Sequence, residues 1–323
     1  AAVPTAPAGY RQAGPLPPLM AAARGRFAAD GVEGAMTVTG GALDGIQRAL
    51  TGHAAPGDAV AIEDPCWANL RDLIVSLGMR PVPVPVDAHG PVPEDLDDAL
   101  RHARAAVITS RAHNPTGAFI TAERAAALRA VLSDHPDVVA IEDDHWAELS
   151  DDPLSPVADA ARRWLFIRSV SKPYGPDLRC AAACGDDTTI ARLQGRMRVG
   201  AGWVSTILQH LVLGVWNDPR TPEVLRAARD SYRRRRRGLL DALAVHDVPA
   251  SGHTGLNVWI PVDDETTTVA ALRDRGYAVS PGAGFRIDAP AAIRVTISGM
   301  SQNAAPAVAE AVAAARRASY PLA

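Results

Sequence analysis

The sequence predicts an α/β fold: a large domain with a mostly parallel central sheet flanked by helices, followed by a smaller C-terminal α+β domain. Up to about residue 186, short β-branched runs bounded by Gly or Pro alternate with Ala-, Leu- and Arg-rich stretches of helical period, which is typical of parallel strands joined by helices. Beyond that residue the pattern changes to long helices and then to shorter strands. We therefore expect an N-terminal arm at residues 1–35, a large domain at 36–217 and a small domain at 218–323.

The strands of the large domain are expected in its short apolar runs, at Ala59–Glu63, Pro81–Val86, Ala105–Thr109, Val138–Glu142, Leu165–Ser169 and Cys180–Cys184. Among the segments between them, Thr121–Ser133 has the length of a helix. Thr121 stands three residues before Arg124, where its hydroxyl can accept a free N–H of the first helical turn. Strands that alternate with such helices predict a parallel sheet.

The smaller domain is expected to begin with a long helix, Thr221–Val245, which contains the arginine run Arg233–Arg237. Because successive helical residues turn by about 100°, such a run wraps the whole helix and cannot form one basic stripe. A solvated or subunit-facing helix is the better interpretation, with nucleic-acid contact a minority alternative. Strands at Leu256–Pro261 and Ile293–Ser298, separated by Thr266–Gly276, complete the domain.

Composition limits the possible functions. A net charge of -3 gives no general attraction to nucleic acid or to an anionic membrane, so neither is expected as a partner of this chain itself. No apolar run approaches the roughly 20 residues that span a bilayer, and no leader pattern opens the chain, so the protein is expected to be cytoplasmic. Cys66, Cys180 and Cys184 lack CxxC spacing, which predicts reduced core residues and no metal site.

The basic residues are unusual, because Lys172 is the single lysine among 33 Lys and Arg residues. Surface ion pairs tolerate either cation. A guanidinium stays protonated in proteins, however, whereas a lysine amine can lose its proton and attack an aldehyde. On composition alone, chance survival of one surface lysine explains the count equally well, so the residues around Lys172 must decide.

Lys172 follows an apolar strand, and Ser169, Ser171 and Arg179 lie close to it in the sequence. Two hydroxyls and a guanidinium beside one amine suit a phosphorylated aldehyde: the amine condenses with the aldehyde while the other groups contact the phosphate. A strand end capped by serines is one alternative, and serine and lysine together can carry other chemistry. A third is an α/β protein that binds phosphate without covalent chemistry.

This segment resembles the Schiff-base motif of fold-type I pyridoxal phosphate enzymes of the class I/II aminotransferase type, and further segments match that family in order. By this resemblance Lys172 holds pyridoxal phosphate. A turn with two glycines precedes a helix, and the resemblance implies phosphate contacts from Gly41, Ala42 and the backbone of Leu43. It also implies that the ring of Trp67 stacks on the cofactor; a buried core tryptophan is the alternative.

The motif HNPTG at residues 113–117 is the most specific of these segments. By resemblance, Asn114 donates to the phenolate oxygen of the cofactor and lies beside the substrate. An apolar strand then ends in Glu142, Asp143 and Asp144. The family places an acid here to pair with the pyridine nitrogen; Asp143 is the choice, with the two neighbours as alternates. His145 stands where, by resemblance, relatives commonly carry a Tyr that donates to the same phenolate oxygen as Asn114. His can also donate, but it loses its proton near neutrality, so the pH response of this contact should differ.

Arg294 lies within an apolar strand late in the chain, where a cation is costly unless it meets an anion. By resemblance this anion is the α-carboxylate of the substrate, held by two parallel hydrogen bonds; an internal salt bridge is the alternative. The implied substrates are an amino acid and a 2-oxo acid. The family also implies a homodimer, since its cofactor site lies at a subunit boundary.

Two variants of the family are similar to this chain: free-standing aminotransferases and the aminotransferase-like domain of MocR-type transcriptional regulators, where the domain senses a ligand. Residues 111–118, 142–145 and 175–179 look like the regulator versions. Residues 1–35 contain no helix-turn-helix pattern, so the chain is expected to be an effector domain or a shortened enzyme. The sequence thus predicts a pyridoxal phosphate site, and leaves turnover against sensing open.

Overall fold

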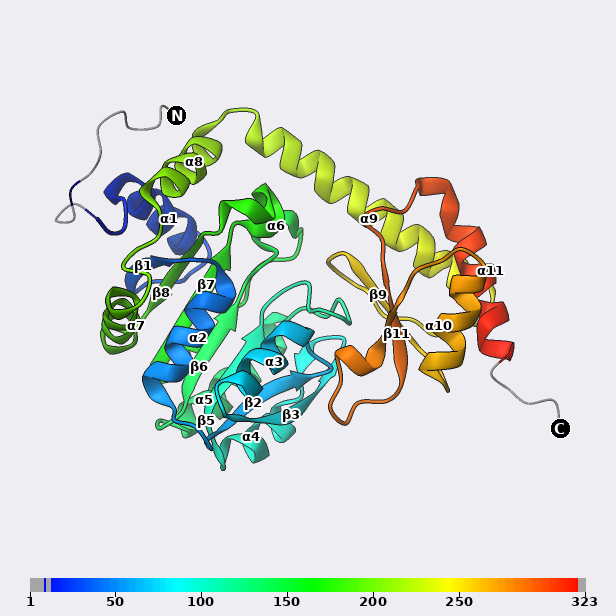
Figure 1. Cartoon of the computed structure of the whole chain (residues 1–323), viewed down its shortest axis with the longest axis horizontal. Coiled ribbons are helices and arrows are strands. Elements are labelled where there is room, and N and C mark those ends of the chain that lie inside the picture. Colours follow the sequence, from blue (N-terminus) through cyan, green and yellow to red (C-terminus); the bar gives the residue numbers. More distant parts are fainter. Residues whose placement is uncertain (1–8, 10–12, 319–323) are drawn as a thin grey trace.

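The structure is a computed structural model that describes residue 9 and residues 13–318. Its elements form two lobes bridged by the long helix α9, Thr221–Val245 (Figure 1). The larger lobe is built on an eight-stranded sheet and the smaller on a three-stranded sheet. The α/β architecture predicted from the alternation of strands and helices is therefore confirmed.

The large sheet has the strand order β1-β8-β7-β6-β5-β2-β3-β4. Its strands are β1 Ala35–Thr39, β2 Ala59–Asp64, β3 Arg80–Asp87, β4 Gly90–Pro91, β5 Ala103–Thr109, β6 Val139–Asp143, β7 Arg163–Ser169 and β8 Ala181–Gly185. All six strands predicted for this domain are present, with ends within two residues of those expected. β1 and the short β4 were not predicted.

The strands β2, β3, β5, β6 and β7 are parallel, as expected, but β8 is antiparallel to both of its neighbours. The expectation of a parallel strand at Cys180–Cys184 is therefore wrong. Only residues 170–180 separate β7 from β8, and a parallel connection needs about a dozen residues or more, usually with a full helix. Because β1 is antiparallel to β8, β1 runs in the same direction as β7.

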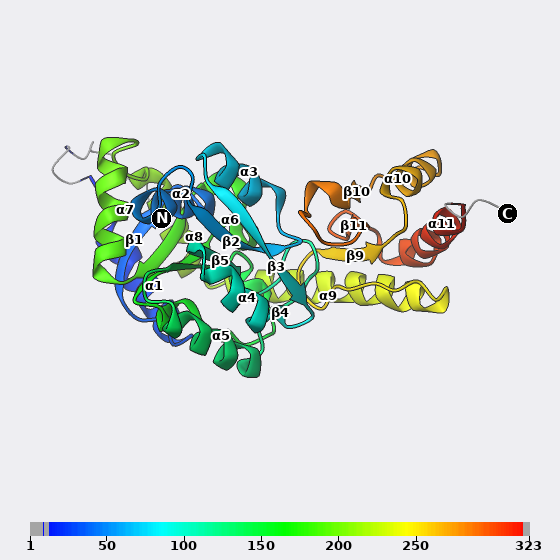
Figure 2. The ribbon, with the colours of Figure 1, turned by 90° about the horizontal axis from the view of Figure 1, so that it is seen from below.

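Helices cover both faces of the large sheet (Figure 2). They are α1 Pro17–Ala28, α2 Ala42–His53, α3 Ala68–Ser76, α4 Pro93–Leu100, α5 Ala122–Asp134, α6 Ser171–Tyr174, α7 Asp187–Val199 and α8 Thr206–Asn217. One buried apolar cluster includes side chains of α2, α3 and α7, and a second includes side chains of α1, α4 and α5. The predicted cap of α5 is confirmed, since the Arg124 N–H donates to Thr121 Oγ1 at 3.2 Å.

The small lobe pairs its strands in the order β10-β11-β9, all antiparallel. Its elements are β9 Asn257–Pro261, α10 Glu265–Asp274, β10 Ser280–Pro281, β11 Ala292–Thr296 and α11 Ala305–Ala318. Leu239 and Leu243 of α9 are buried with Val258 and Ile293 of this sheet. The predicted strands and helices of this region are thus present, although β11 begins and ends slightly earlier than expected.

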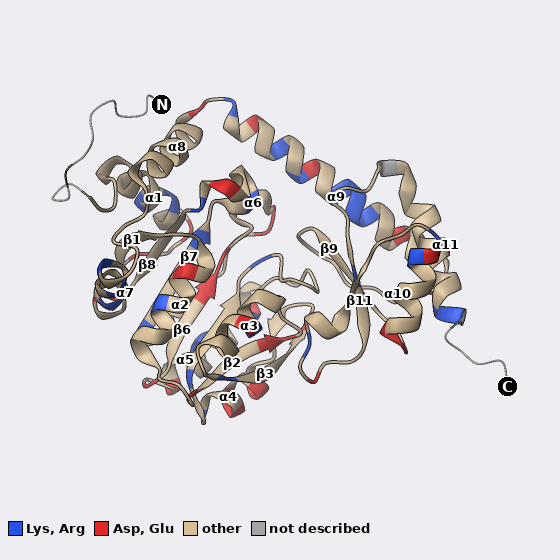
Figure 3. Ribbon diagram, viewed as in Figure 1, with Lys and Arg blue, Asp and Glu red and all other residues tan. Residues whose placement is uncertain are grey.

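The arginine run of α9 turns around the helix, and its contacts diverge accordingly. Arg233 pairs with Asp151 of the large lobe, whereas the Arg235 and Arg236 guanidinium groups donate to the carbonyls of Ser298 and Gly255. Acidic residues are interspersed among the more numerous basic residues along this helix in Figure 3. Arg233 therefore connects α9 to the large lobe, whereas Arg235 and Arg236 hold it to the small lobe. None of the helices in the part of the chain that the structure describes is long and apolar enough to cross a membrane.

The cysteines are free and buried, as predicted. Burial raises the pKa of the Cys66 and Cys180 thiols to about 12, and that of Cys184 to about 11. Thiols with such pKa values stay protonated near neutrality, and a protonated thiol is a poor nucleophile. They act as small apolar core residues.

Candidate functional site

The residues singled out in the sequence gather at one edge of the large sheet. Because β1, β2, β5, β6 and β7 run in the same direction, their carboxyl ends share that edge, where open α/β sheets bind ligands. The predicted residues end or follow these strands, or precede β8: Gly41, Ala42, Leu43, Trp67, Asn114, Asp143, His145, Ser169, Ser171, Lys172 and Arg179. Arg294 reaches the same edge from the small lobe, through its contact with Asn114.

The turn from β1 to α2 brings free helical N–H groups close to the Arg179 guanidinium. Gly41 is the N-cap of α2, with no side-chain cap, so the N–H groups of Ala42 and Leu43 open the helix without intrahelical acceptors. Arg179 Nη2 donates to the Gly40 carbonyl at 3.0 Å. A Cβ at Gly41, where φ is +109°, would lie 2.7 Å from that nitrogen. Two predicted phosphate contacts, far apart in sequence, are thus neighbours.

Lys172 lies exposed on the short helix α6. Within the described ranges no side chain or carbonyl forms a hydrogen bond or ion pair with its amine. The strand end before it is ordered by a local contact, in which the Ser171 N–H donates to Ser169 Oγ at 3.2 Å. The Lys172 amine is therefore available for chemistry and not engaged in a structural ion pair.

Asp143 carries a buried carboxylate oxygen that lacks a partner. Its Oδ2 accepts from His145 Nδ1 at 2.8 Å, while its Oδ1 is buried without a hydrogen bond. An ionised carboxylate can only accept, so Nδ1 of His145 carries the proton. A buried acceptor without a donor is costly, and a protonated ring nitrogen at Oδ1 would remove that cost.

The two acids beside Asp143 are fully engaged. Glu142 accepts from the Ser110 hydroxyl and from the N–H groups of Val157 and Ala158. Asp144 accepts from the guanidinium groups of two arginines, Arg111 and Arg168. Burial alone would raise the pKa of Asp144, but these arginines hold it below its usual range. The hydrogen bonds therefore favour Asp143 over both alternates as the acid that meets a ligand.

Glu142 predicts a pH dependence of stability. Burial raises its pKa from 4.5 to about 7, so the folded state holds this proton over a range in which the unfolded chain releases it. The stabilisation is complete below about pH 4.5 and is lost as pH rises to about 7. In Glu142→Gln, the amide can accept from Val157 and Ala158 and donate to Ser110 Oγ without titrating. The unfolding temperature of the variant should therefore rise relative to that of wild type as the pH increases from 5 to 8.

Thermal unfolding at several pH values checks this expectation. Glu310→Gln, at an exposed position of α11, is the matched control and should track the wild-type profile. A Glu142→Gln profile parallel to wild type over the whole range would mean that Glu142 does not titrate there.

Arg294 is half-buried on β11 and has polar partners but no acidic one. Its Nη1 donates to Asn114 Oδ1 at 3.0 Å and its Nη2 to Ser280 Oγ at 3.3 Å, while Nε is buried without a partner. No described carboxylate pairs with it, so the internal salt bridge considered as an alternative is not found. Burial lowers the pKa of Arg294, and an incoming anion would offset that desolvation.

Trp67 is the N-cap residue of α3 and is half-buried against the core cluster of the large lobe. Its indole N–H is buried without a partner. Both roles considered for it, core packing and contact with a bound ring, are compatible with this position.

The sequence profile of aminotransferase class I and II matches residues 19–312. The chain belongs to this family. Members of the class use pyridoxal phosphate, so the predicted cofactor is confirmed along with the predicted family. The matched residues include every predicted cofactor and substrate contact, from Gly41 to Arg294.

Among curated relatives, the chain is 41% identical over 276 residues to the vitamin B6 salvage pathway transcriptional repressor PtsJ of Salmonella typhimurium, covering 84% of this chain and 64% of the repressor. It is 26% identical over 243 residues to an aspartate/prephenate aminotransferase of Thermus thermophilus, covering 71% and 63%. The chain thus spans less than two thirds of each relative. The predicted kinship with both regulators and enzymes is confirmed.

A solved structure of Pyrococcus horikoshii kynurenine aminotransferase superposes with a TM-score of 0.86 at 19% identity, covering 96% of this chain and 82% of that chain. This likeness establishes the fold-type I architecture. It says nothing about the reaction of this aminotransferase-family chain.

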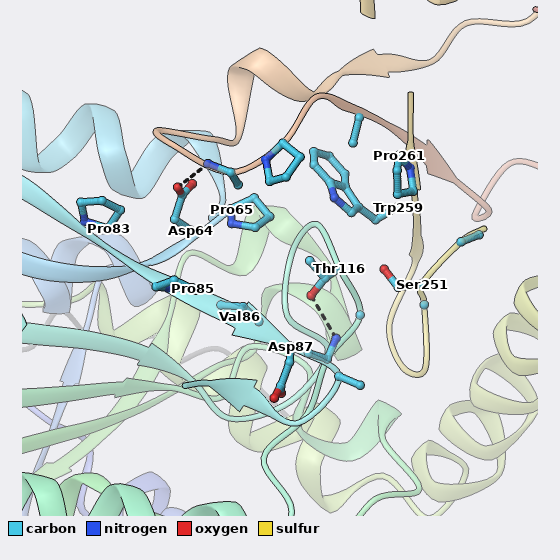
Figure 4. Close-up of a pocket in the computed structure, with 18 of the residues that line it drawn as sticks. Asp64, Pro65, Pro83, Pro85, Val86, Asp87, Thr116, Ser251, Trp259 and Pro261 are labelled. Atoms are coloured by element: carbon cyan, nitrogen blue, oxygen red, sulfur yellow. Dashed lines mark hydrogen bonds between the residues drawn. The ribbon is translucent and has the colours of Figure 1, made fainter. Parts of the chain in front are cut away.

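A separate cavity of about 840 Å³ lies between the lobes, lined by residues of β3, the loop after Asn114, the segment before β9 and the second half of β9 (Figure 4). Prolines and Trp259 form much of its wall, and Asp64 at its edge is satisfied by the N–H groups of residues 287–289. None of the predicted cofactor residues lines it. The predicted cofactor residues therefore lie at the sheet edge and not in the wall of this cavity.

One residue at the edge was missed by the sequence reasoning. Asn257, on β9, donates from Nδ2 to Asn114 Oδ1 at 3.1 Å. The two residues are 143 positions apart, and Asn257 belongs to no motif. The position inside a predicted strand was the one available signal, and it does not tell a polar core-edge residue from an exposed one.

Proposed function

We propose that this chain binds pyridoxal phosphate covalently through Lys172 and accepts an amino acid or 2-oxo acid beside it. The observation that carries the proposal is the set of unsatisfied groups at one sheet edge: the free Lys172 amine, the partnerless Oδ1 of Asp143 and the Arg179–Gly41 cradle. The Lys172 amine suits the aldehyde of the cofactor, Asp143 Oδ1 suits its ring nitrogen, and the Arg179–Gly41 cradle suits its phosphate. Bound pyridoxal phosphate supplies the aldehyde that condenses with an amine and a ring that draws electrons from the substrate α-carbon.

The residues of the chain have distinct tasks in this proposal. Lys172 would hold the cofactor, and as a free amine its Nζ would take up and return the α-proton of the substrate. Asp143 keeps a negative charge at the ring nitrogen. His145 donates Nδ1–H to Asp143 Oδ2 and so fixes which carboxylate oxygen remains open.

The substrate carboxylate is assigned to Arg294. Its guanidinium carries one unpartnered buried nitrogen and a weak 3.3 Å contact to Ser280, so a carboxylate can replace the latter with a charge-assisted pair. The Phe285 ring lies 4.4 Å from the guanidinium carbon and restrains its plane. Such a site recognises the α-carboxylate and leaves the side chain of the substrate undefined.

Half-reactions with a panel of amino acids test the enzymatic form of the proposal. The cofactor-loaded protein should lose its visible absorption as the amino form of the cofactor accumulates, and a 2-oxo acid should restore it. A loaded protein whose spectrum no amino acid changes would contradict transamination while leaving cofactor binding intact.

A ligand-sensing role is the second candidate. The 41% identity with a repressor named for vitamin B6 salvage supports it, since in such a role occupancy of the site is the signal and turnover is unnecessary. A change in lobe arrangement on loading, measured by small-angle scattering, with no half-reaction would favour sensing. Rapid half-reactions without a change in the scattering profile would favour the enzymatic role.

The cradle at Gly41 gives a mutational prediction. In Gly41→Ala the new methyl would collide with the Arg179 guanidinium, so the dissociation constant for pyridoxal phosphate should rise by about tenfold, the loss of one charge-assisted contact. Gly57→Ala is the matched control, because Gly57 also has a positive φ, of +93°, but open space around it. Equal cofactor affinity in the two variants, measured by absorbance titration, would count against the cradle.

We also propose a homodimer. Exposed apolar side chains lie on and before α8, at Val199, Ile207 and Leu211, and Ile207 and Leu211 share one face at i, i+4 spacing. Apolar side chains grouped on a surface mark protein interfaces. Sedimentation of the wild-type chain and of Ile207→Asp tests this assignment.

A further inference from the structure

The small lobe contributes to the cofactor edge through a chain of side-chain hydrogen bonds. Thr296 Oγ1 donates to Asn257 Oδ1 at 3.0 Å, and Asn257 Nδ2 donates to Asn114 Oδ1 at 3.1 Å. Thr296 and Asn257 face each other as a cross-strand pair of β11 and β9. Arg294 Nη1 donates to the same Asn114 oxygen at 3.0 Å.

This network fixes the orientation of the Asn114 amide. An amide has one acceptor atom and one donor atom, and which of them points where is set by its neighbours. Arg294 can only donate. Asn257 presents its NH₂ to Asn114, since its own oxygen is taken by the Thr296 hydroxyl. Asn114 Oδ1 therefore faces two donors, and its Nδ2 must face the opposite way.

The opposite orientation of the Asn114 amide would be unfavourable at both its nitrogen and its oxygen. Its NH₂ would meet the donors of Arg294 and Asn257, leaving partly buried polar hydrogens without acceptors. Its oxygen would face the position where the family carries the phenolate oxygen, and two acceptors would then repel. Arg294 supplies one of the two donors that hold this orientation, and Asn257 supplies the other.

We infer that Asn257 is a positioning residue for the cofactor, acting through Asn114: together with Arg294, it keeps the Asn114 N–H directed at the phenolate oxygen. This inference rests on the proposed cofactor binding at Lys172. It makes the small lobe part of the cofactor site before any substrate arrives. It also means that separation of the lobes would loosen the phenolate contact.

Asn257→Asp is the test variant, because it keeps size and the acceptor for Thr296 but cannot donate to Asn114. Asn303→Asp, an exposed residue of the same lobe, makes the same charge change away from the site. Both are titrated with pyridoxal phosphate, the pH midpoint of the visible band is measured, and unfolding of the cofactor-free protein reports the fold. Thr296→Val, at an exposed position, is a milder second variant.

In Asn257→Asp the dissociation constant should rise by about tenfold, and the midpoint should move to higher pH because the phenolate loses an oriented donor. Thr296→Val should shift both in the same direction by a smaller amount, and Asn303→Asp should match wild type. Wild-type behaviour of both Asn257→Asp and Thr296→Val, or lower fold stability with an unchanged midpoint, would overturn the inference. A wild-type chain that forms no visible band would instead sink the proposed function and this inference together.

Discussion

Lys172→Ala should abolish covalent retention of pyridoxal phosphate. The variant removes the single lysine of the chain, so no side-chain amine remains to condense with the aldehyde, and the visible band should be absent after gel filtration. Loss of the amine that moves the α-proton should also slow any half-reaction by about 10³-fold or more. Lys172→Arg should behave the same way, since its guanidinium stays protonated.

A matched control separates the position from the residue type. Arg162 is exposed and immediately precedes β7. The double variant Lys172→Ala with Arg162→Lys therefore has a lysine again, but not at the proposed site. This double variant should remain colourless. A band that survives in Lys172→Ala would contradict the assignment.

Asp144→Ala should be among the most destabilising single substitutions in the large lobe. Asp144 is fully buried and bridges Arg111 and Arg168, whose side chains are 7% and 6% exposed. Removing the shared carboxylate leaves Arg168 with Asp30 and two aromatic rings as partners, and Arg111 with a backbone carbonyl. Breaking one partner of a buried ionic cluster costs about 3–5 kcal/mol, which denaturant unfolding would measure as a lower free energy of unfolding.

Asp241→Ala is the control for this variant. Asp241 faces Arg237 at 3.9 Å on the open side of α9, and both side chains are mostly exposed. Exposed pairs contribute little, so its unfolding curve should overlay that of wild type. If Asp144→Ala did the same, the buried cluster would be shown to have no net role in stability.

Local signals explain what the sequence could predict. The runs of β2, β5 and β6 are continuous apolar segments with clear ends, and the capping hydroxyl of Thr121 is a contact within one turn. Such features depend on neighbouring residues, so periodicity and capping rules find them. The long helix α9 was predicted to its terminal residues for the same reason.

The direction of a strand and the hydrogen-bond partners of a side chain depend on contacts between distant parts of the chain, and for these features the predictions were weaker. The antiparallel direction of β8 follows from the short connection that precedes it. The predicted parallel direction rested only on the alternation of strands and helices. The choice among Glu142, Asp143 and Asp144 rests on donors from residues as far away as Ser110 and Arg168. Asn257 contacts Asn114 from the other lobe, and no sequence pattern within β9 predicts that contact.

The central claim is that Lys172 carries the cofactor, and its most direct test is chemical. The chain is incubated with pyridoxal phosphate, the bond to the protein is reduced with borohydride, and an arginine-specific digest is mapped by mass spectrometry. We expect one modified peptide, residues 169–179, with the added mass on Lys172. An added mass found only on an α-amino group, or on no peptide, would contradict it.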